Sequence, residues 1–190
     1  MMDKPNNPGI YVYQRTTPKS SPVLKDLLQL SKTVAAGKSS GFSFVHGSSS
    51  LIPHLTLWEN LQLSAPRELW DDFVKDSHPV ISALIPLIKE PYKKSSVAAP
   101  WECFLVSLMK GILEPTPHLL VDMQEEMFSA FVVKTVKATL MKTSGEKVIY
   151  LSSVAPSLWL DCAHSLVKKN GYSFVIEELN REEIRRHWAA

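Results

Sequence analysis

The spacing of apolar and polar residues along the chain predicts a β-sheet whose strands alternate with helices. Short runs rich in β-branched and aromatic residues are typical of strands, and they lie at residues 9–15, 41–47, 118–123, 147–154 and 172–179. Apolar residues at helical spacing predict helices at residues 98–117, 125–145, 155–171 and 180–190. Because strands and helices alternate in the second half of the chain, we expect a mainly parallel sheet with right-handed crossovers.

Capping and turn residues refine these boundaries. Thr56 and Glu59 have the spacing of a capping box and predict a short helix after residue 56. Pro100 stands at a favourable first-turn position, and Gly145 is expected to close the helix before it. Residues 20–31 are amphipathic and fit either a strand or a helix.

One stretch differs from the rest of the chain in its prolines. Residues 65–99 have helical spacing, but Pro79, Pro86 and Pro91 break this stretch into short helices. We therefore expect a small helical lobe over about 65–99 that stands apart from the sheet. A length of 190 residues suits one domain, which we place at 10–190, after a flexible N-terminus at 1–9.

Composition excludes several classes of protein. A formal net charge of +2 without a concentrated basic face argues against nucleic-acid binding. No apolar run reaches the roughly 18 residues of a membrane span, so direct membrane insertion is not expected. Cys103 and Cys162 lie in apolar surroundings, and the first residues lack the apolar core of a signal peptide. These features predict a cytoplasmic protein with buried thiols.

Short motifs give little support for an enzyme. Gly37-Lys38-Ser39 matches only the end of G-x-x-x-x-G-K-[ST], and the strand predicted from residue 41 leaves no room for the helix that must follow. The six histidines lack metal-ligand spacing, and no G-x-S-x-G elbow is present. Glu125 and Glu126 fall in a predicted first helical turn, where acids simply complement the dipole. We expect neither a metal site nor a hydrolase.

Longer stretches resemble the ATP-binding subunit of an ABC transporter. "LIPHLTLWENLQL" (51–63) is similar to the family's segment after the Q-loop, where L-x-x-H-L-T-V-x-E-N is common. "PHLLVDM" (117–123) resembles the Walker B strand, and "GEKVIYLSSV" (145–154) resembles the H-loop strand. "AHSLVKKNGYSFVIEE" (163–178) is similar to the segment after the H-loop, and residues 22–47 resemble the family's opening.

The resemblance implies a P-loop-NTPase-like α/β fold whose catalytic positions are altered. Asp122 takes the place of the Walker B aspartate, and Met123 that of the glutamate general base. Ser153 takes the place of the H-loop histidine, and His46 stands nearest the Q-loop glutamine. Methionine cannot accept a proton from water, and serine is a poor γ-phosphate sensor.

Two glycine-dependent elements of the family also differ. Its signature sequence maps by spacing onto residues 98–102, which contain no glycine. After residues 41–47 the chain passes within four residues into "LIPHLT", so the P-loop lysine and its helix are expected to be deleted. Together these departures predict a pseudo-ATPase that binds no cofactor.

A pseudo-ATPase of this kind is expected to act by binding a partner. The resemblance places a partner groove between the sheet core and the helical lobe, with candidate contacts at His54, Leu57, Trp58, Trp70 and Trp101. Core packing is the alternative role of the tryptophans, although tryptophan is enriched in interface hot spots. The expected partner is a membrane subunit, an active ABC ATPase or a second copy of this chain, at the cytoplasmic face of the inner membrane.

Two other functions remain open. The first is a small α/β enzyme or ligand-binding protein of another family. The second is an ABC subunit that contributes nucleotide contacts only within a heterodimer. Neither the machine that the protein serves nor its oligomeric state follows from the sequence.

Overall fold

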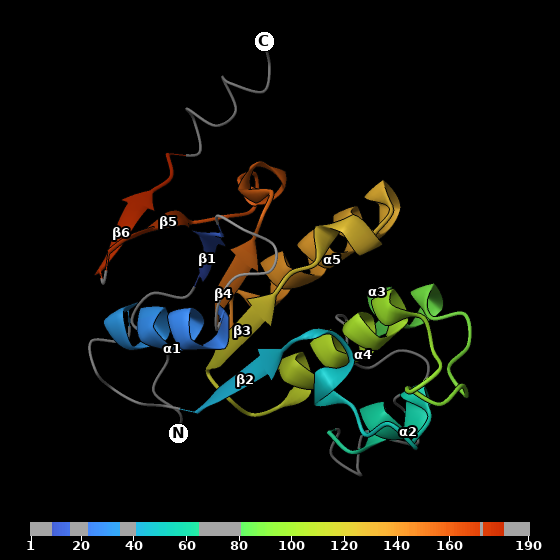
Figure 1. Cartoon of the computed structure of the whole chain (residues 1–190). Coiled ribbons are helices and arrows are strands. Elements are labelled where there is room, and N and C mark those ends of the chain that lie inside the picture. The colour runs from blue at the N-terminus through green and yellow to red at the C-terminus, as the bar shows by residue number, and fades with distance from the viewer. Residues whose placement is uncertain (1–8, 16–22, 35–40, 65–80, 172, 181–190) are drawn as a thin grey trace.

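A six-stranded sheet forms the centre of the computed structural model, which describes residues 9–15, 23–34, 41–64, 81–171 and 173–180 (Figure 1). The strands are β1 (Gly9–Gln14), β2 (Phe42–Val45), β3 (His118–Asp122), β4 (Val148–Ser153), β5 (Ser165–Asn170) and β6 (Ser173–Glu178). Their order is β2-β3-β4-β1-β5-β6, and all neighbours are parallel except β5 and β6. This confirms the α/β class and the mainly parallel sheet.

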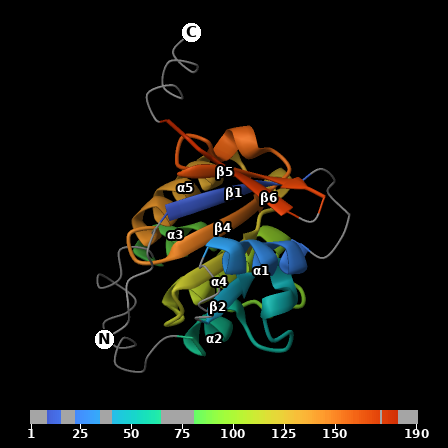
Figure 2. The ribbon, with the colours of Figure 1, turned by 90° about the vertical axis from the view of Figure 1, so that its left-hand side faces the viewer.

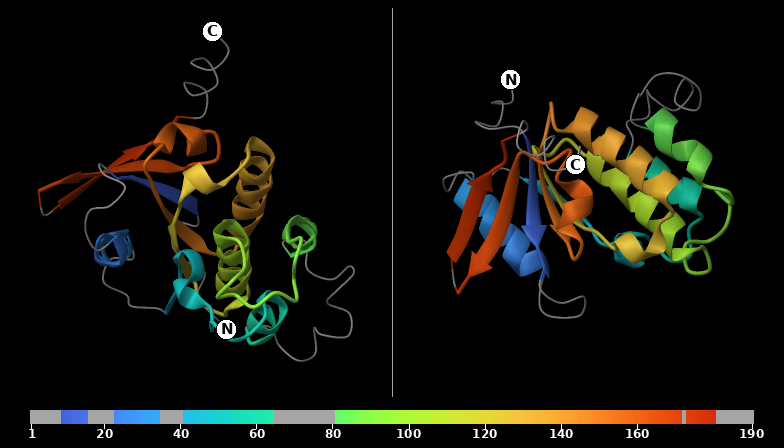
Figure 3. Two further views of the ribbon diagram at one scale, coloured as in Figure 1. Left: turned by 45° about the vertical axis from the view of Figure 1, so that its right-hand side comes forward. Right: turned by 90° about the horizontal axis from the view of Figure 1, so that it is seen from above.

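Helices cover both faces of the sheet. The α-helices are α1 (Val23–Val34), α2 (Leu57–Gln62), α3 (Ile81–Leu84), α4 (Pro100–Leu113) and α5 (Ala130–Thr143). Single 3₁₀ turns are η1 (Gly47–Ser50), η3 (Ile85–Leu87), η4 (Glu125–Met127) and η5 (Pro156–Trp159). Helix α1 lies on one face, which Figure 2 views, and α4 and α5 lie on the other (Figure 3, left).

The two apolar clusters follow from the alternation of side chains along the strands. On the α1 face, Leu120 and Tyr150 pack with Leu27 and Leu30 of the helix. On the opposite face, the alternate residues of β3 and β4 pack with α4 and α5. Because β3 and β4 are buried along their whole length, they read as continuous apolar runs in the sequence.

Most elements lie where the pattern places them. The ambiguous segment 20–31 contributes to α1, and α4 begins at Pro100 as expected. Helix α5 is shorter than predicted, because it starts only at Ala130, after the N-cap Ser129. It ends at Thr143 with Ser144 as C-cap, so Gly145 stands directly after the cap, at the position where a glycine commonly follows a helix.

The helix predicted at 155–171 is wrong. Residues 156–159 form η5, and Ser165–Asn170 form β5, which pairs with β1 on one side and β6 on the other. Gly171, with a φ of 61°, turns β5 into β6 and does not end a helix. The local spacing of apolar residues favours a helix. The backbone groups of residues 165–170 instead form their hydrogen bonds with β1 and β6.

The helical lobe is described only in part. Residues 81–99 contain α3, η3 and turns, as the prolines predicted. The expected lobe residues 65–80, the N-terminus before Gly9 and the helix predicted after Asn180 lie outside the described residues. No helix among the described segments is long and apolar enough to cross a bilayer. Cys103 and Cys162 are both buried, as expected, and burial raises the pKa of each thiol.

The "LIPHLTLWENLQL" segment owes most of its pattern to folding. Thr56 and Glu59 form the predicted capping box, in which the Glu59 amide donates to Thr56 Oγ1 (3.1 Å) and the Thr56 amide donates to Glu59 Oε2 (2.8 Å). Asn60 is fully buried: its Oδ1 accepts from the Ile52 amide (2.7 Å), and its Nδ2 donates to the carbonyls of Ile52 (3.1 Å) and Thr56 (3.0 Å). Asn60 thus fixes the loop ahead of α2.

The first prediction concerns the close approach of α4 to the sheet. A Cβ at Gly111 would lie 2.8 Å from Leu119 Cδ1 and 3.0 Å from Val45 Cγ2. We expect Gly111→Val to lower the free energy of unfolding by about 1–3 kcal/mol through overpacking, as measured by urea denaturation. Gly145→Ala is the control, because the nearest atom to its added Cβ lies at 3.5 Å. An unchanged urea midpoint for Gly111→Val would contradict the packing.

The second prediction concerns Asn60. Asn60→Ala leaves the Ile52 amide without its side-chain acceptor, and we expect the free energy of unfolding to fall by about 1–3 kcal/mol. Gln62→Ala, at an exposed position of the same helix, should change it by less than about 0.5 kcal/mol. Equal effects of the two substitutions in urea denaturation would mean that Asn60 does not fix the loop.

Candidate functional site

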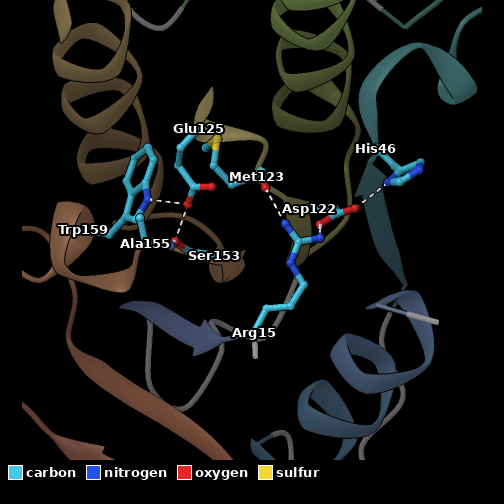
Figure 4. Close-up of polar contacts among 8 residues, drawn as sticks. All are labelled: Arg15, His46, Asp122, Met123, Glu125, Ser153, Ala155 and Trp159. Atoms are coloured by element: carbon cyan, nitrogen blue, oxygen red, sulfur yellow. Dashed lines mark hydrogen bonds and ion pairs between the residues drawn. The ribbon is translucent and has the colours of Figure 1, made fainter. Parts of the chain in front are cut away.

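The carboxyl ends of the parallel strands meet at one edge of the sheet, where open α/β proteins place their functional groups. Asp122 at the end of β3 is opposite Ser152 of β4, and Ser153 is opposite Gln14 of β1. The predicted position of Asp122 at a strand end is therefore confirmed. His46 follows β2 directly, so the four positions Asp122, Met123, Ser153 and His46 gather at this edge (Figure 4).

The Asp122 carboxylate is buried and engaged on both oxygens. Its side chain is 2% exposed. Its Oδ1 accepts from Arg15 Nη1 at 2.8 Å, and its Oδ2 lies 2.6 Å from His46 Nδ1. His46 itself is half-exposed and stacks on Phe44 of β2, with ring centroids 5.6 Å apart. Asp122 thus links the ends of β1, β2 and β3.

Arg15 is the residue at this edge that sequence reasoning missed. Its guanidinium also donates from Nη2 to the Met123 carbonyl at 3.1 Å, and its amide donates to the Ser153 carbonyl at 2.8 Å. The side chain is 9% exposed. One feature could have indicated it: Arg15 is a charged residue directly after β1, a strand whose first five residues are buried.

A second polar group lies close by, around Glu125 in η4 (Figure 4). Glu125 is buried, and its Oε1 accepts from Ser153 Oγ and from Trp159 Nε1 (3.1 Å). The Ser153 hydroxyl in turn accepts from the Ala155 amide at 3.0 Å. Glu125 does lie in a first helical turn, although that turn belongs to η4 and not to α5, and its carboxylate is buried and accepts these two hydrogen bonds as well.

The two polar groups face opposite sides of the sheet. Asp122 follows Leu120 by two residues and so lies on the α1 face, whereas Ser153 follows Leu151 and lies on the α4–α5 face. Met123 packs in the α4–α5 cluster with no exposed surface. The edge therefore carries two separate networks, one centred on Asp122 and one on Glu125.

Helix α1 is tied to the sheet by a further network. Asp26, in its first turn, accepts from Tyr13 Oη at 3.0 Å and from Lys169 Nζ at 2.7 Å. Burial, reinforced by the hydrogen bond to Asp26, raises the pKa of Tyr13 to about 12. These contacts join α1 to β1 and β5, next to the Asp122 network.

The chemistry of this edge is limited by these contacts. Met123 has no proton-accepting side chain, and the Ser153 hydroxyl is turned toward Glu125. A divalent cation does not fit against Asp122 while the guanidinium occupies the position beside Oδ1 and the Met123 carbonyl. Across the ranges that the structure describes, no group of three or more His, Cys, Asp and Glu side chains is placed to hold a metal ion.

A strand followed by a helix, the framework of a phosphate-binding unit, occurs at a different place from the one expected. After β2 the chain enters η1 at Gly47, and no Walker A helix follows there. A helix does follow the central strand β1, however: the next described element along the chain is α1, with residues 15–22 between the two. The sequence of 15–22, RTTPKSSP, contains no glycine and does not match G-x-x-x-x-G-K-[ST].

The five candidate partner contacts differ in their exposure. His54 is exposed, and Trp58 and Trp101 are half-buried against the core. Leu57 is only 1% exposed, so its side chain is part of the core and is not available to a partner. Leu57 occupies the first turn of α2, whose inward face carries the apolar residues. Trp70 lies outside the described residues.

His54, which is exposed, and Trp58, which is half-buried, belong to a surface made of two paired loops, residues 52–58, which run into the start of α2, and 90–97. Four backbone hydrogen bonds of 2.8–3.1 Å join the loops, from the amides of Leu57, Trp58, Ser95 and Ser96 to the carbonyls of Lys93, Pro91, Leu55 and Pro53. This paired-loop surface exposes the apolar side chains Ile52, Tyr92 and Val97, of which Tyr92 is 78% exposed.

Comparison with known proteins identifies the fold. No protein-family model matches the sequence, and no curated protein is similar enough in sequence to match. One similar solved structure is the dimeric post-hydrolysis state of the ATP-binding cassette protein MJ0796, bound to ADP and Pi. It aligns with a TM-score of 0.63 over 94% of this chain and 88% of that chain, at 11% sequence identity. The chain therefore has the α/β fold of an ATP-binding cassette domain.

Proposed function

We propose that this protein is a catalytically inactive, ABC-ATPase-like interaction subunit. The observation that carries the proposal is the contact of Arg15 with Asp122 and the Met123 carbonyl. In a phosphoryl-transfer site the corresponding edge must accept a polyphosphate and its metal ion. Here the strand ends are held together by the protein's own side chains.

Three further features support inactivity. Residues 15–22, between β1 and α1, contain a Lys-Ser pair at Lys19-Ser20 but none of the glycines with which a phosphate-binding loop approaches its phosphates. Met123, where a general base is expected, is a core residue. Ser153 accepts from Ala155 and donates to Glu125, so its hydroxyl is already used within the fold.

We propose the paired-loop surface as the place where a partner docks. Its backbone is fixed by the four hydrogen bonds between the loops, so little conformational entropy is lost on binding. Tyr92 and His54 are exposed on it, and Trp58 lies at its edge, half-buried. Exposed aromatic residues on a rigid surface are typical interface anchors. The partner is an ABC-type subunit: a membrane subunit, an active ATPase or a second copy, at the cytoplasmic face of the membrane.

The third prediction tests inactivity. Isothermal titration of the protein with millimolar Mg-ATP should give no saturable heat, because residues 15–22 lack the glycines of a phosphate-binding loop and Arg15 contacts Asp122 and the Met123 carbonyl. The same titration with ATP in EDTA separates nucleotide binding from metal binding. A dissociation constant in the micromolar range would contradict the proposal and favour a subunit that supplies nucleotide contacts.

The fourth prediction tests the docking surface. Tyr92→Ala should weaken partner binding by about 2 kcal/mol, roughly 30-fold, if Tyr92 is an anchor. The measurement is recovery of the cross-linked partner from native membranes. Phe131→Ala on α5 is a matched control, because Phe131 is also largely exposed, at 67%. Circular dichroism checks that both variants are folded. Loss of the partner with Phe131→Ala but not with Tyr92→Ala would place the interface elsewhere.

A further inference from the structure

The guanidinium of Arg15 occupies a position that has the chemistry of a cation site. The two groups that it contacts are a carboxylate oxygen, Asp122 Oδ1 at 2.8 Å, and a backbone carbonyl, Met123 O at 3.1 Å. Carboxylate and carbonyl oxygens are the ligands that hard divalent cations prefer. The other carboxylate oxygen contacts His46, whose half-exposed ring borders solvent.

Burial favours a cation at this position. The Asp122 side chain is 2% exposed, and a buried carboxylate without a counter-charge is strongly destabilising. Arg15 supplies the charge from a fixed position, because its amide continues the β1–β4 hydrogen bonding through the Ser153 carbonyl. The counter-charge is thus covalently attached to the neighbouring strand.

We propose that Arg15 is a built-in counter-cation that takes the place of a divalent metal ion at Asp122 and the Met123 carbonyl. The strand ends are therefore linked by the protein's own side chains, without a bound ion. This inference goes beyond the proposed function, because it concerns the metal requirement of the fold and holds whether or not a partner or a nucleotide binds.

The test removes the built-in cation and asks whether a metal ion replaces it. Arg15→Ala should lower the melting temperature and create a site for Mn²⁺, a cation that accepts oxygen and imidazole ligands. At about tenfold excess over the dissociation constant, Mn²⁺ should raise the melting temperature of this variant by about 3–6 °C. Loss of the free Mn²⁺ signal in electron paramagnetic resonance measures binding directly.

Three proteins serve as controls. The wild type and Arg15→Lys, which keeps a positive charge, should neither bind Mn²⁺ nor change in melting temperature. Arg15→Ala/Asp122→Asn should also be unresponsive, because the carboxylate has been removed. A purely structural role of Arg15 predicts destabilisation in Arg15→Ala without any response to Mn²⁺.

Each outcome decides the proposal. It is overturned if Arg15→Ala does not respond to Mn²⁺, or if the wild type responds to the same extent. If Arg15→Ala does not fold alone, the readout is its refolding yield: recovery with Mn²⁺ supports the proposal, and no recovery overturns it. The ATP titration of the wild type is independent of this result, so failure here leaves the proposed lack of nucleotide binding in place.

Discussion

A buried carboxylate at the end of a fully buried strand is the constraint on which this edge of the structure depends. Asp122 ends β3, which is covered on both faces, and its charge requires partners within the fold. Arg15 and His46 supply them from the strands on either side of the β3–β4 pair. As a result, side-chain contacts link three strand ends that are distant in the sequence, in addition to the backbone pairing of the strands.

The same principle explains the neighbouring Glu125 network. A position where the ABC resemblance implies a phosphate-sensing histidine holds Ser153, whose hydroxyl bridges Glu125 and the Ala155 amide. Trp159 from η5 donates to the same carboxylate oxygen. Polar groups at the edge of the sheet are thus directed into the protein, where they fix the loops that follow β3 and β4.

The sequence predicts the framework well because the framework depends on local patterns. Buried strands give continuous apolar runs, and Pro100 and the Thr56–Glu59 pair mark helix starts that the structure confirms. The prediction of a helix at residues 155–171 is wrong because this segment contains β5, which is stabilised by strands on both sides. A local apolar pattern does not reveal such neighbours.

The candidate site is predictable only in part, for a related reason. Asp122 could be placed from its position at the end of a strand. The contacts that Arg15 and Glu125 make within the protein depend on the strand order and on a 3₁₀ turn, and residue spacing reveals neither of these. The resemblance of residues 51–63 predicts a partner surface, yet Asn60, Leu57 and the capping box within this segment serve the fold.

The central position of β1 has a consequence for the way the chain reaches this structure. β1 is the first strand in the sequence, but its neighbours are β4 and β5, so that Gly9 pairs with Val148 and Tyr11 with Ser165. During synthesis on the ribosome, β1 emerges long before either neighbour exists. Sheets dominated by such distant pairings fold slowly and expose apolar strands meanwhile. The completion of this sheet therefore waits for the last third of the chain, and β1 is the strand most in need of protection from aggregation until then.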